Sequence, residues 1–390
     1  MKPTPAAPPL SFWALLKAEV HAVFTNQVAV LTMFGGVIFY SFLYPLPYEK
    51  QTPLALPIAV VNLDGSAVSR ELERMVDATP QVRVVKREYT LADAQADFLA
   101  QRIRGYLVIP EHFYRDLRLG RSVTLAYAGD ATYFLVYGTL VEGLVAAGGT
   151  LAAQTKVERL LMAGEPVALA AEQFAVTDIN MKPTFNPTIG YMNYVVPAVF
   201  VLILQQTLAM AAGLITGSQK GQHGYWVQNG AARVIWVRAL VLVTIYYLLS
   251  LYYFGFSFLF HDVYPIGTMG DTLTLLLPFL LTTTFIGIWL GLVAPRREWV
   301  SAVVLMSSLP LVFSVGFIWP VEAMPSAIVW LSYVFPSTPG IQGFLSLNQM
   351  GADWPQVWPK YAILWGQVLF WGSLCHWQFR KQFSASNPKN

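Results

Sequence analysis

The residue types that usually carry catalysis are sparse in this chain and do not cluster. There is a single cysteine, Cys375, and the five histidines are scattered, so neither an internal disulfide nor a metal cluster is expected. The pattern G-x-x-x-x-G-K-[ST], which binds nucleotide phosphates, does not occur, so the chain is not expected to hydrolyse ATP itself. The loops offer only isolated acidic groups. The sequence therefore indicates no catalytic, cofactor or metal site.

Composition places the chain in the membrane. Its 390 residues are 55% hydrophobic and only 12% charged, and the mean hydropathy is positive, which argues against a soluble globular protein. The first ten residues lack the apolar core and cleavage site of a signal peptide, so we expect the N-terminus to remain in the mature protein.

Apolar stretches long enough to cross a bilayer of roughly 30 Å predict an α-helical membrane protein. Charge between these stretches then predicts their orientation, because basic residues gather on the cytoplasmic side. Ten lie on one side, namely Lys2, Lys17, Lys220, Arg233, Arg238, Arg296, Arg297, Arg380, Lys381 and Lys389, and only Lys360 lies on the other. Both termini are therefore expected in the cytoplasm and the long segment 47–186 outside it. The six predicted spans are 26–46, 188–213, 236–260, 272–293, 299–319 and 357–377.

The segment from Tyr133 to Ala153 competes for the status of a seventh span. It is apolar apart from Glu142, but a span there would reverse the sidedness of the arginines that follow. A mid-span glutamate would also cost about 2.5–3.5 kcal/mol. We therefore predict a long helix from about Tyr133 to Gly164 that packs on its own domain.

The rest of segment 47–186 predicts a small α/β domain, because short strand-like and helix-like stretches alternate. In the stretch N-L-D-G-S-A-V-S-R-E-L, Asp64 to Ser66 could bind a ligand or simply cap a helix, and capping is the favoured interpretation. The predicted strands are 57–62, 82–86, 105–109 and 122–127, and the predicted helices are 67–78, 91–102 and 111–119.

Two other segments have a pattern of their own. Leu10 to Phe24 gathers Phe12, Trp13, Leu16, Val20, Val23 and Phe24 near one helical face, which is typical of a helix lying on the cytoplasmic membrane surface; a plain extension of the first span is the alternative. After the fifth span, Pro320 and Pro325 cannot both sit inside a straight helix. The chain is expected to stop near Trp319 and to form a short re-entrant pair over 320–345, with a second break at 336–339 and Glu322 at its wet edge.

These motifs resemble a known family. The arrangement G-F-I-W-P-V-E-A-M-P, followed by P-S-T-P-G-I-Q-G, is similar to the fifth-span signature of ABC-2 type permeases, the membrane subunits of ATP-driven exporters. P-I-A-V-V-N-L-D-G-S-A-V-S-R-E-L at 57–72 is similar to the start of the extracytoplasmic domain in their efflux branch. The resemblance implies an ABC exporter permease in a bacterial inner membrane. The predicted parts of the chain are a cytoplasmic N-terminus with an interfacial helix (1–25), the first span (26–46), the extracytoplasmic α/β domain (47–186), the second to sixth spans (187–377) and a cytoplasmic tail (378–390).

The resemblance also implies partners and roles for residues. ATP and Mg²⁺ would belong to a separate ATP-binding subunit, which the loop 214–235 would contact; the relatives' acidic residues around a Gly-Thr pair are missing there. The coupling residues would be Lys220, His223, Tyr225, Trp226 and Arg233, and the outer gate would comprise Trp319, Pro320, Glu322 and Pro325. A second permease subunit, identical or not, would complete the pathway, and an adaptor and outer-membrane channel are left open as partners. Lipid surrounds the spans, and no nucleic acid is expected.

The second and fifth spans would line the pathway. Their polar residues, which could instead bond neighbouring helices, are Asn193, Gln205, Gln206, Ser307, Ser308 and Ser314. No charge occurs deep in a predicted span, which favours an apolar or amphipathic cargo over ion coupling. Two other functions remain open: a membrane receptor or scaffold whose outer domain binds a partner, and a membrane enzyme acting on lipid.

Overall fold

The computed structural model describes residues 8–49, 52–164, 166, 184–186, 190–221 and 224–385. By contacts the chain divides into two compact units. One comprises residues 1–49 together with 190–390, and the other comprises residues 50–189. Each unit is described by itself, and they are called the helical unit and the inserted unit.

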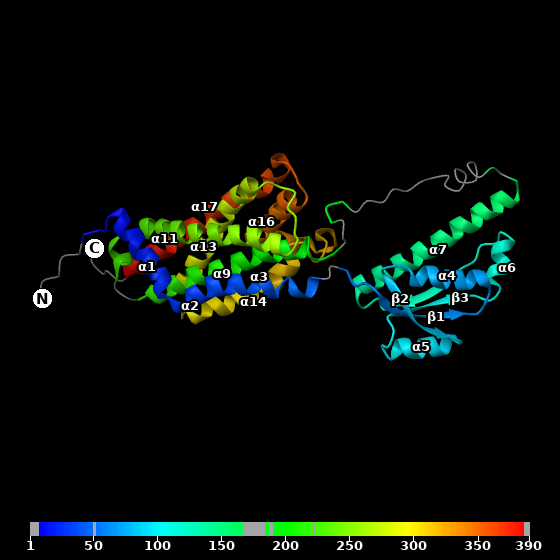
Figure 1. The fold of residues 1–390 in the computed structure, drawn as a ribbon. Coiled ribbons are helices and arrows are strands. Elements are labelled where there is room, and N and C mark those ends of the chain that lie inside the picture. Colours follow the sequence, from blue (N-terminus) through cyan, green and yellow to red (C-terminus); the bar gives the residue numbers. More distant parts are fainter. Residues whose placement is uncertain are drawn as a thin grey trace. The chain divides into compact units, whose positions relative to one another are not determined.

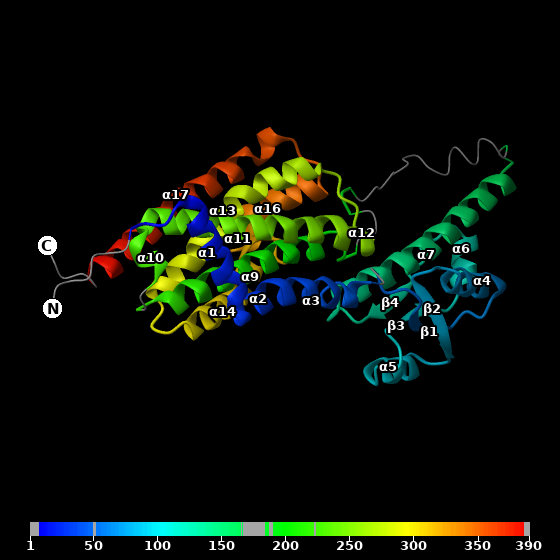
Figure 2. The same cartoon turned by 60° about the vertical axis from the view of Figure 1, so that its left-hand side comes forward.

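The helical unit is a bundle in which α9, α11, α13 and α17 run side by side (Figures 1 and 2). α1 lies toward the same end of the bundle as the C-terminal part of α17. Its longer helices are α1 (Phe12–Thr25), α3 (Gly36–Leu43), α9 (Val195–Gln219), α11 (Ala231–Leu251), α13 (Met269–Val293), α14 (Glu298–Ser314) and α17 (Trp354–Ala385). The shorter ones are α2 (Gln27–Val30), α10 (Tyr225–Gln228), α12 (Phe258–Phe260), α15 (Ser326–Ser332) and α16 (Ser337–Phe344), with π or 3₁₀ turns at η1 (Leu31–Gly35), η2 (Leu46–Tyr48), η3 (Tyr252–Ser257), η4 (Val321–Ala323) and η5 (Leu345–Gln349).

Five helices in the described part of the chain are long and apolar enough to cross a membrane. Four of them correspond to predicted spans, namely Gln27–Tyr48, Val195–Gln219, Ala231–Phe260 and Met269–Val293. The fifth is Phe134–Met162, which the sequence analysis excluded as a span. The predicted spans 299–319 and 357–377 are absent from the five, so the predicted total of six is not reproduced by these criteria.

The helix of the predicted fifth span is shorter than expected, because it ends before Pro320 and Pro325. α14 has 17 residues and stops at Ser314, five residues before the expected end at Trp319. Gly316 follows with φ of 101°, a conformation that residues with a side chain rarely adopt. The glycine therefore ends the helix, and Pro320 acts only on the chain that follows.

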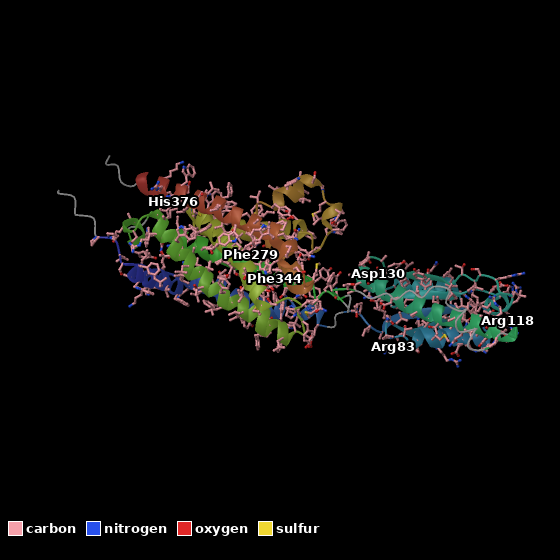
Figure 3. All side chains as sticks on the ribbon, turned by 90° about the horizontal axis from the view of Figure 1, so that it is seen from above. Arg83, Arg118, Asp130, Phe279, Phe344 and His376 are labelled. Atoms are coloured by element: carbon pink, nitrogen blue, oxygen red, sulfur yellow. The ribbon has the colours of Figure 1, made fainter. Side chains whose placement is uncertain are left out.

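The re-entrant pair differs from the prediction at its second half. The second break lies at 333–336, between α15 and α16, and so begins three residues before the predicted 336–339. Pro336 caps α16 and Pro339 lies in its first turn, so neither proline interrupts that helix. A proline there loses no intrahelical hydrogen bond, since the first N–H groups of a helix have no partner inside it. α16 is almost entirely buried and α15 is mostly exposed. Phe344, at the end of α16, lies inside the bundle with Phe279 of α13 (Figure 3).

α9 and α13 pack with almost no side chain between them. A Cβ added to Gly287 would lie 2.5 Å from the carbonyl oxygen of Ala209, and one added to Gly291 would lie 2.5 Å from that of Gly213. Small residues at a helix interface allow such close approach, which is a main source of attraction between helices in lipid. This contact holds α9 rigidly against α13.

The inserted unit contains a four-stranded sheet in the order β2-β1-β3-β4, with β4 antiparallel to its neighbour. Its strands are β1 (Leu56–Asn62), β2 (Val82–Glu88), β3 (Gly105–Ile109) and β4 (Ala126–Gly129), and its helices are α4 (Ala67–Asp77), α5 (Leu91–Leu99), α6 (Phe113–Arg118) and α7 (Phe134–Met162). Asp130 follows β4 and Arg118 ends α6 (Figure 3). Only β4 departs clearly from its predicted range, since it begins four residues later than expected.

The loop before α4 caps the helix, as the favoured interpretation predicted. The Ser66 hydroxyl accepts a hydrogen bond from the Ser69 amide at 3.1 Å. The first strand alternates between two cores, since Ile58 and Val60 pack with α4 and α7 while Ala59 and Val61 pack with α5. Both faces of the sheet are therefore covered.

α7 explains why its sequence looks like a membrane span. Leu140, Leu144, Ala147 and Leu151 form one face that is buried in the core of the inserted unit. The helix runs along the sheet beside α4 (Figure 1). Its predicted packing on its own domain is therefore confirmed, although its length and composition would also suit a bilayer.

Candidate functional site

A buried ion pair joins α1 to α11. Arg238, the eighth residue of α11, donates through Nε and Nη2 to the two carboxylate oxygens of Glu19, each at 2.9 Å. The Glu19 side chain is fully buried and that of Arg238 is 2% exposed. Two parallel hydrogen bonds between guanidinium and carboxylate are the strongest geometry for such a pair. The pair therefore fixes α1 against the bundle.

The end of α9 completes the shell around Arg238. Nη1 donates to the Thr216 hydroxyl at 2.9 Å, and Nη2 also donates to the Gln219 side-chain oxygen. The Gln219 amide in turn donates to the Tyr225 hydroxyl at 3.2 Å. Burial and the negative charge of Glu19 raise the pKa of Tyr225 to about 12, so this phenol stays neutral near pH 7. Helices α1, α9, α10 and α11 thus meet in one hydrogen-bonded cluster, called here the coupling cluster.

The packed face of α1 differs from the predicted apolar face. Leu15, Glu19 and Val23 are buried, at a spacing of four residues along one side of the helix. Phe12, Trp13, Val20 and Phe24 are exposed in the described structure. The exposed aromatic side chains suit contact with a membrane surface, and that placement remains a prediction.

The predicted coupling loop is shorter than 214–235. α9 continues to Gln219, with Thr216 and Ser218 donating their hydroxyl protons to carbonyls of their own helix, and α11 begins at Ala231. His223 lies outside the described residues. Lys220 is tied to the end of α13 through a 2.8 Å bond to the carbonyl of Ala294.

Tyr225 and Trp226 are anchors rather than a free surface. Their rings meet edge to face at 5.2 Å, and Trp226 packs against the core of the helical unit. Gly224 permits this, since a Cβ there would lie 2.3 Å from the Trp226 ring. Arg233 is half-buried in the first turn of α11. The exposed residues of α10 are Val227 and Gln228, which the sequence analysis did not select.

Three of the predicted pathway residues line one cavity of about 170 Å³. Gln205 and Gln206 reach it from α9, and Ser307 reaches it from α14. The other lining residues come from α9, α13 and α14, with Phe335 and Trp371 added: Ala209, Thr283, Ile286, Trp289, Leu290, Val303, Val304, Leu311, Phe335 and Trp371. The cavity is not lined by the other three predicted residues, Asn193, Ser308 and Ser314. Asn193 lies in the turn before α9, and the two serines donate to carbonyls of their own helix.

The four predicted gate residues, Trp319, Pro320, Glu322 and Pro325, are exposed in the described structure. The hairpin is instead held by residues that the sequence analysis missed. Gln342 of α16 donates to the carbonyl of Val315 at 2.7 Å and accepts from the Tyr333 hydroxyl at 3.0 Å. Gln367 of α17 donates to the carbonyl of Tyr333 at 2.7 Å. These bonds, called here the hairpin clamp, hold Tyr333, two residues before Phe335 of the cavity wall.

Replacing Gln342 with leucine should loosen the hairpin without unfolding the bundle. The variant loses two hydrogen bonds and leaves the carbonyl of Val315 without its donor. The free energy that keeps the hairpin closed should fall by about 1–3 kcal/mol. Amide exchange across residues 316–335 should then be roughly 5- to 150-fold faster, as measured by hydrogen–deuterium exchange and mass spectrometry. Glu322→Gln is the matched control, since that side chain is exposed. Equal exchange in both variants would contradict the clamp.

Comparisons with known proteins identify the family. A model described as "ABC-2 family transporter protein" matches residues 28–375. The inner membrane transport permease YhhJ of Escherichia coli (strain K12) is 24% identical over 329 residues, which cover 79% of this chain and 80% of that protein. The protein of the same name in Shigella flexneri matches to the same extent. Since the family model spans most of the chain, including the helices that form the cavity, the protein belongs to the ABC-2 transporter family.

Proposed function

We propose that this chain is the permease subunit of an ATP-driven exporter in a bacterial inner membrane, and that it moves an apolar or amphipathic substrate outward. Family membership supports a transport subunit rather than a catalytic enzyme. One observation carries the mechanism: α9 ends in the coupling cluster and also carries the two glutamines of the cavity. A receptor or scaffold would need neither feature.

Transmission along α9 follows from its packing. Gln206 and Gln219 are 13 residues apart on one helix, or about 20 Å at 1.5 Å per residue. Tight contact with α13 prevents α9 from bending, so displacement of α10 would tilt it as a rigid body and change the cavity. An ATP-binding subunit that presses on α10 could act in this way, and a second permease subunit would complete the pathway.

The proposed topology places both termini in the cytoplasm and the inserted unit outside it, with α14 and α17 as the fifth and sixth spans. α14 is about 26 Å long by its 17 residues, close to the shortest length that crosses a bilayer, and α17 has 32 residues. Single cysteines introduced at Thr90 and at Gln382 test this, with Cys375 replaced by serine. A membrane-impermeant thiol reagent should label the first and not the second in spheroplasts. The reverse pattern would overturn the topology.

The transport proposal is tested by purification and reconstitution. An ATP-binding subunit should copurify with the chain, and inside-out vesicles containing both should accumulate a fluorescent amphipathic dye only when ATP is added. Failure to copurify such a subunit, together with no accumulation of dye when ATP is added, would favour the receptor or scaffold.

The surface of α10 yields a sharper prediction. Val227→Asp should reduce ATP-driven transport by at least tenfold while leaving the amount of folded protein unchanged, because the side chain is 41% exposed and the new charge is solvated. Trp226→Asp should instead lower stability, since the ring packs against the core. The measurements are vesicle transport and thermal stability in detergent. Normal transport by Val227→Asp would remove α10 as the docking surface.

A further inference from the structure

Two residues of the cavity wall carry side-chain oxygens that nothing in the described protein satisfies. The side-chain oxygens of Gln205 and Gln206 are buried without a hydrogen-bond partner among the described residues. The two residues are only 6% and 8% exposed. Each such oxygen costs free energy unless another molecule donates a hydrogen bond to it. Two neighbouring unsatisfied oxygens in one cavity therefore point to a ligand.

The two hydroxyl groups of the wall already donate their protons within the protein. The hydroxyls of Ser307 and Thr283 donate to carbonyls of their own helices, at 2.7 Å and 2.8 Å. Their protons are thus committed, and their oxygens can only accept. A ligand hydroxyl can donate to the oxygens of Gln205, Gln206 or Ser307 and also accept from the amide N–H groups of the glutamines.

The apolar wall sets the size and charge of the ligand. Among the described lining residues none is charged, so an ionic group would be buried here without a counter-charge. Trp289 and Trp371 meet edge to face at 5.4 Å and contribute aromatic surface. A cavity of about 170 Å³ matches a single six-membered ring, since roughly 150 Å³ suffices for benzene.

We propose that this cavity binds an uncharged, ring-sized group that carries a hydroxyl or N–H donor, as in a phenol. The inference deepens the proposed function by naming the chemical class that the permease recognises. A transported molecule and a membrane lipid could both present such a group, and the experiments below separate the two sources.

Binding is measured by thermal unfolding of the purified chain in detergent, with probes that share one ring. 4-Methylphenol should raise the midpoint of thermal unfolding in a saturable way. Toluene should bind at least about fivefold more weakly, because it cannot form the hydrogen bond. 4-Methylbenzoate, which is charged, should have no effect. The double variant Gln205→Leu/Gln206→Leu keeps the side-chain size. It should be no less stable than wild type, because it removes unpaired buried amides, and it should no longer distinguish 4-methylphenol from toluene.

Filling the cavity gives a second test. Ser307→Phe should abolish the effect of both neutral probes. Identical responses of wild type and the leucine double variant to 4-methylphenol, or an unchanged response in Ser307→Phe, would overturn the inference and leave a cavity filled by water.

Vesicle transport with the ATP-binding subunit then identifies the source of the ring. Loss of transport in Ser307→Phe assigns the group to the cargo. If transport is unchanged and a lipid copurifies with wild type but not with Ser307→Phe, the ring-sized group belongs to a membrane lipid. Both results agree with the proposed chemistry of the group. Probe binding does not need ATP or a partner, so intact binding without any ATP-driven transport would refute the proposed function and not this inference.

Discussion

Replacing Glu19 with alanine should destabilise the helical unit by about 3–5 kcal/mol, the range found when one partner of a buried ion pair is removed. The reason is that Arg238 would keep its charge while only 2% exposed, with Thr216 and Gln219 as neutral partners. The measurement is the thermal midpoint of the detergent-solubilised protein, followed by fluorescence-detected size exclusion. Transport should also be lost, because α1 would no longer be fastened to α11.

Two controls separate stability from coupling. Lys17→Ala changes an exposed residue of the same helix and should leave the midpoint unchanged. Glu19→Leu combined with Arg238→Met removes both charges together, and most of the stability should return because no unpaired buried charge remains. Transport should stay low in this double variant, since the hydrogen bonds that join α1, α9 and α11 are absent. A midpoint for Glu19→Ala equal to that of Lys17→Ala would contradict the role of the pair.

The ion pair shows what sequence patterns miss. Arg238 was counted as a cytoplasmic surface charge, because a single basic residue at the edge of an apolar stretch usually marks the positive side of the membrane. Its partner is 219 residues away in sequence, and pairing at that separation leaves no local pattern. The one usable signal was the position of Glu19 between Leu15 and Val23 at four-residue spacing, which puts an acid on the packed face of a helix.

Helix positions were predicted better than helix ends. No charged residue occurs from Thr272 to Val293, so the predicted helix 272–293 begins within three residues of the observed start at Met269 and ends where α13 ends. The prediction placed the end of α14 too late, because it took Pro320 as the residue that stops the helix. Gly316, with its positive φ, stops it earlier. Of the polar residues predicted to line the pathway, Gln205, Gln206 and Ser307 line one cavity, and their role in transport stays a prediction. Ser308 and Ser314 do not line that cavity. All three serines donate to carbonyls of their own helix, so only their place around the helix separates Ser307 from the other two, and composition does not give that place.

Hydropathy alone does not distinguish α7 of the inserted unit from a membrane span. α7 passes the length and composition criteria for a span, yet its apolar side covers a sheet. α17 is 32 residues long and fails the same criteria. The charge distribution favoured the interpretation in which α7 stays outside the membrane. The charge distribution thus favoured the packing that α7 shows, because it weighs every later loop at once, while the sidedness itself remains a prediction.

Gly287→Ala should strongly impair the protein, although it adds only one methyl group. The new Cβ would lie 2.5 Å from the carbonyl oxygen of Ala209 and 2.7 Å from the Cβ of Ala212, so α9 and α13 would have to move apart. Overpacking of this kind costs about 1–3 kcal/mol or more, and backbone atoms cannot swing aside as a flexible side chain can. Because α9 carries both Gln219 and the cavity glutamines, we expect transport to fall at least tenfold in vesicles.

The matched control is Gly366→Ala in α17, where an added Cβ meets nothing within 4 Å. Alanine is favoured over glycine within a helix by roughly 0.5–1 kcal/mol, so this variant should be as stable as wild type or slightly more so. The double change at Gly287 and Gly291 should be no worse than about the sum of the two single changes, because both push the same pair of helices apart and the first separation relieves the second clash. Wild-type stability and transport in Gly287→Ala would show that α9 moves freely against α13, and rigid transmission from α10 to the cavity would then fail.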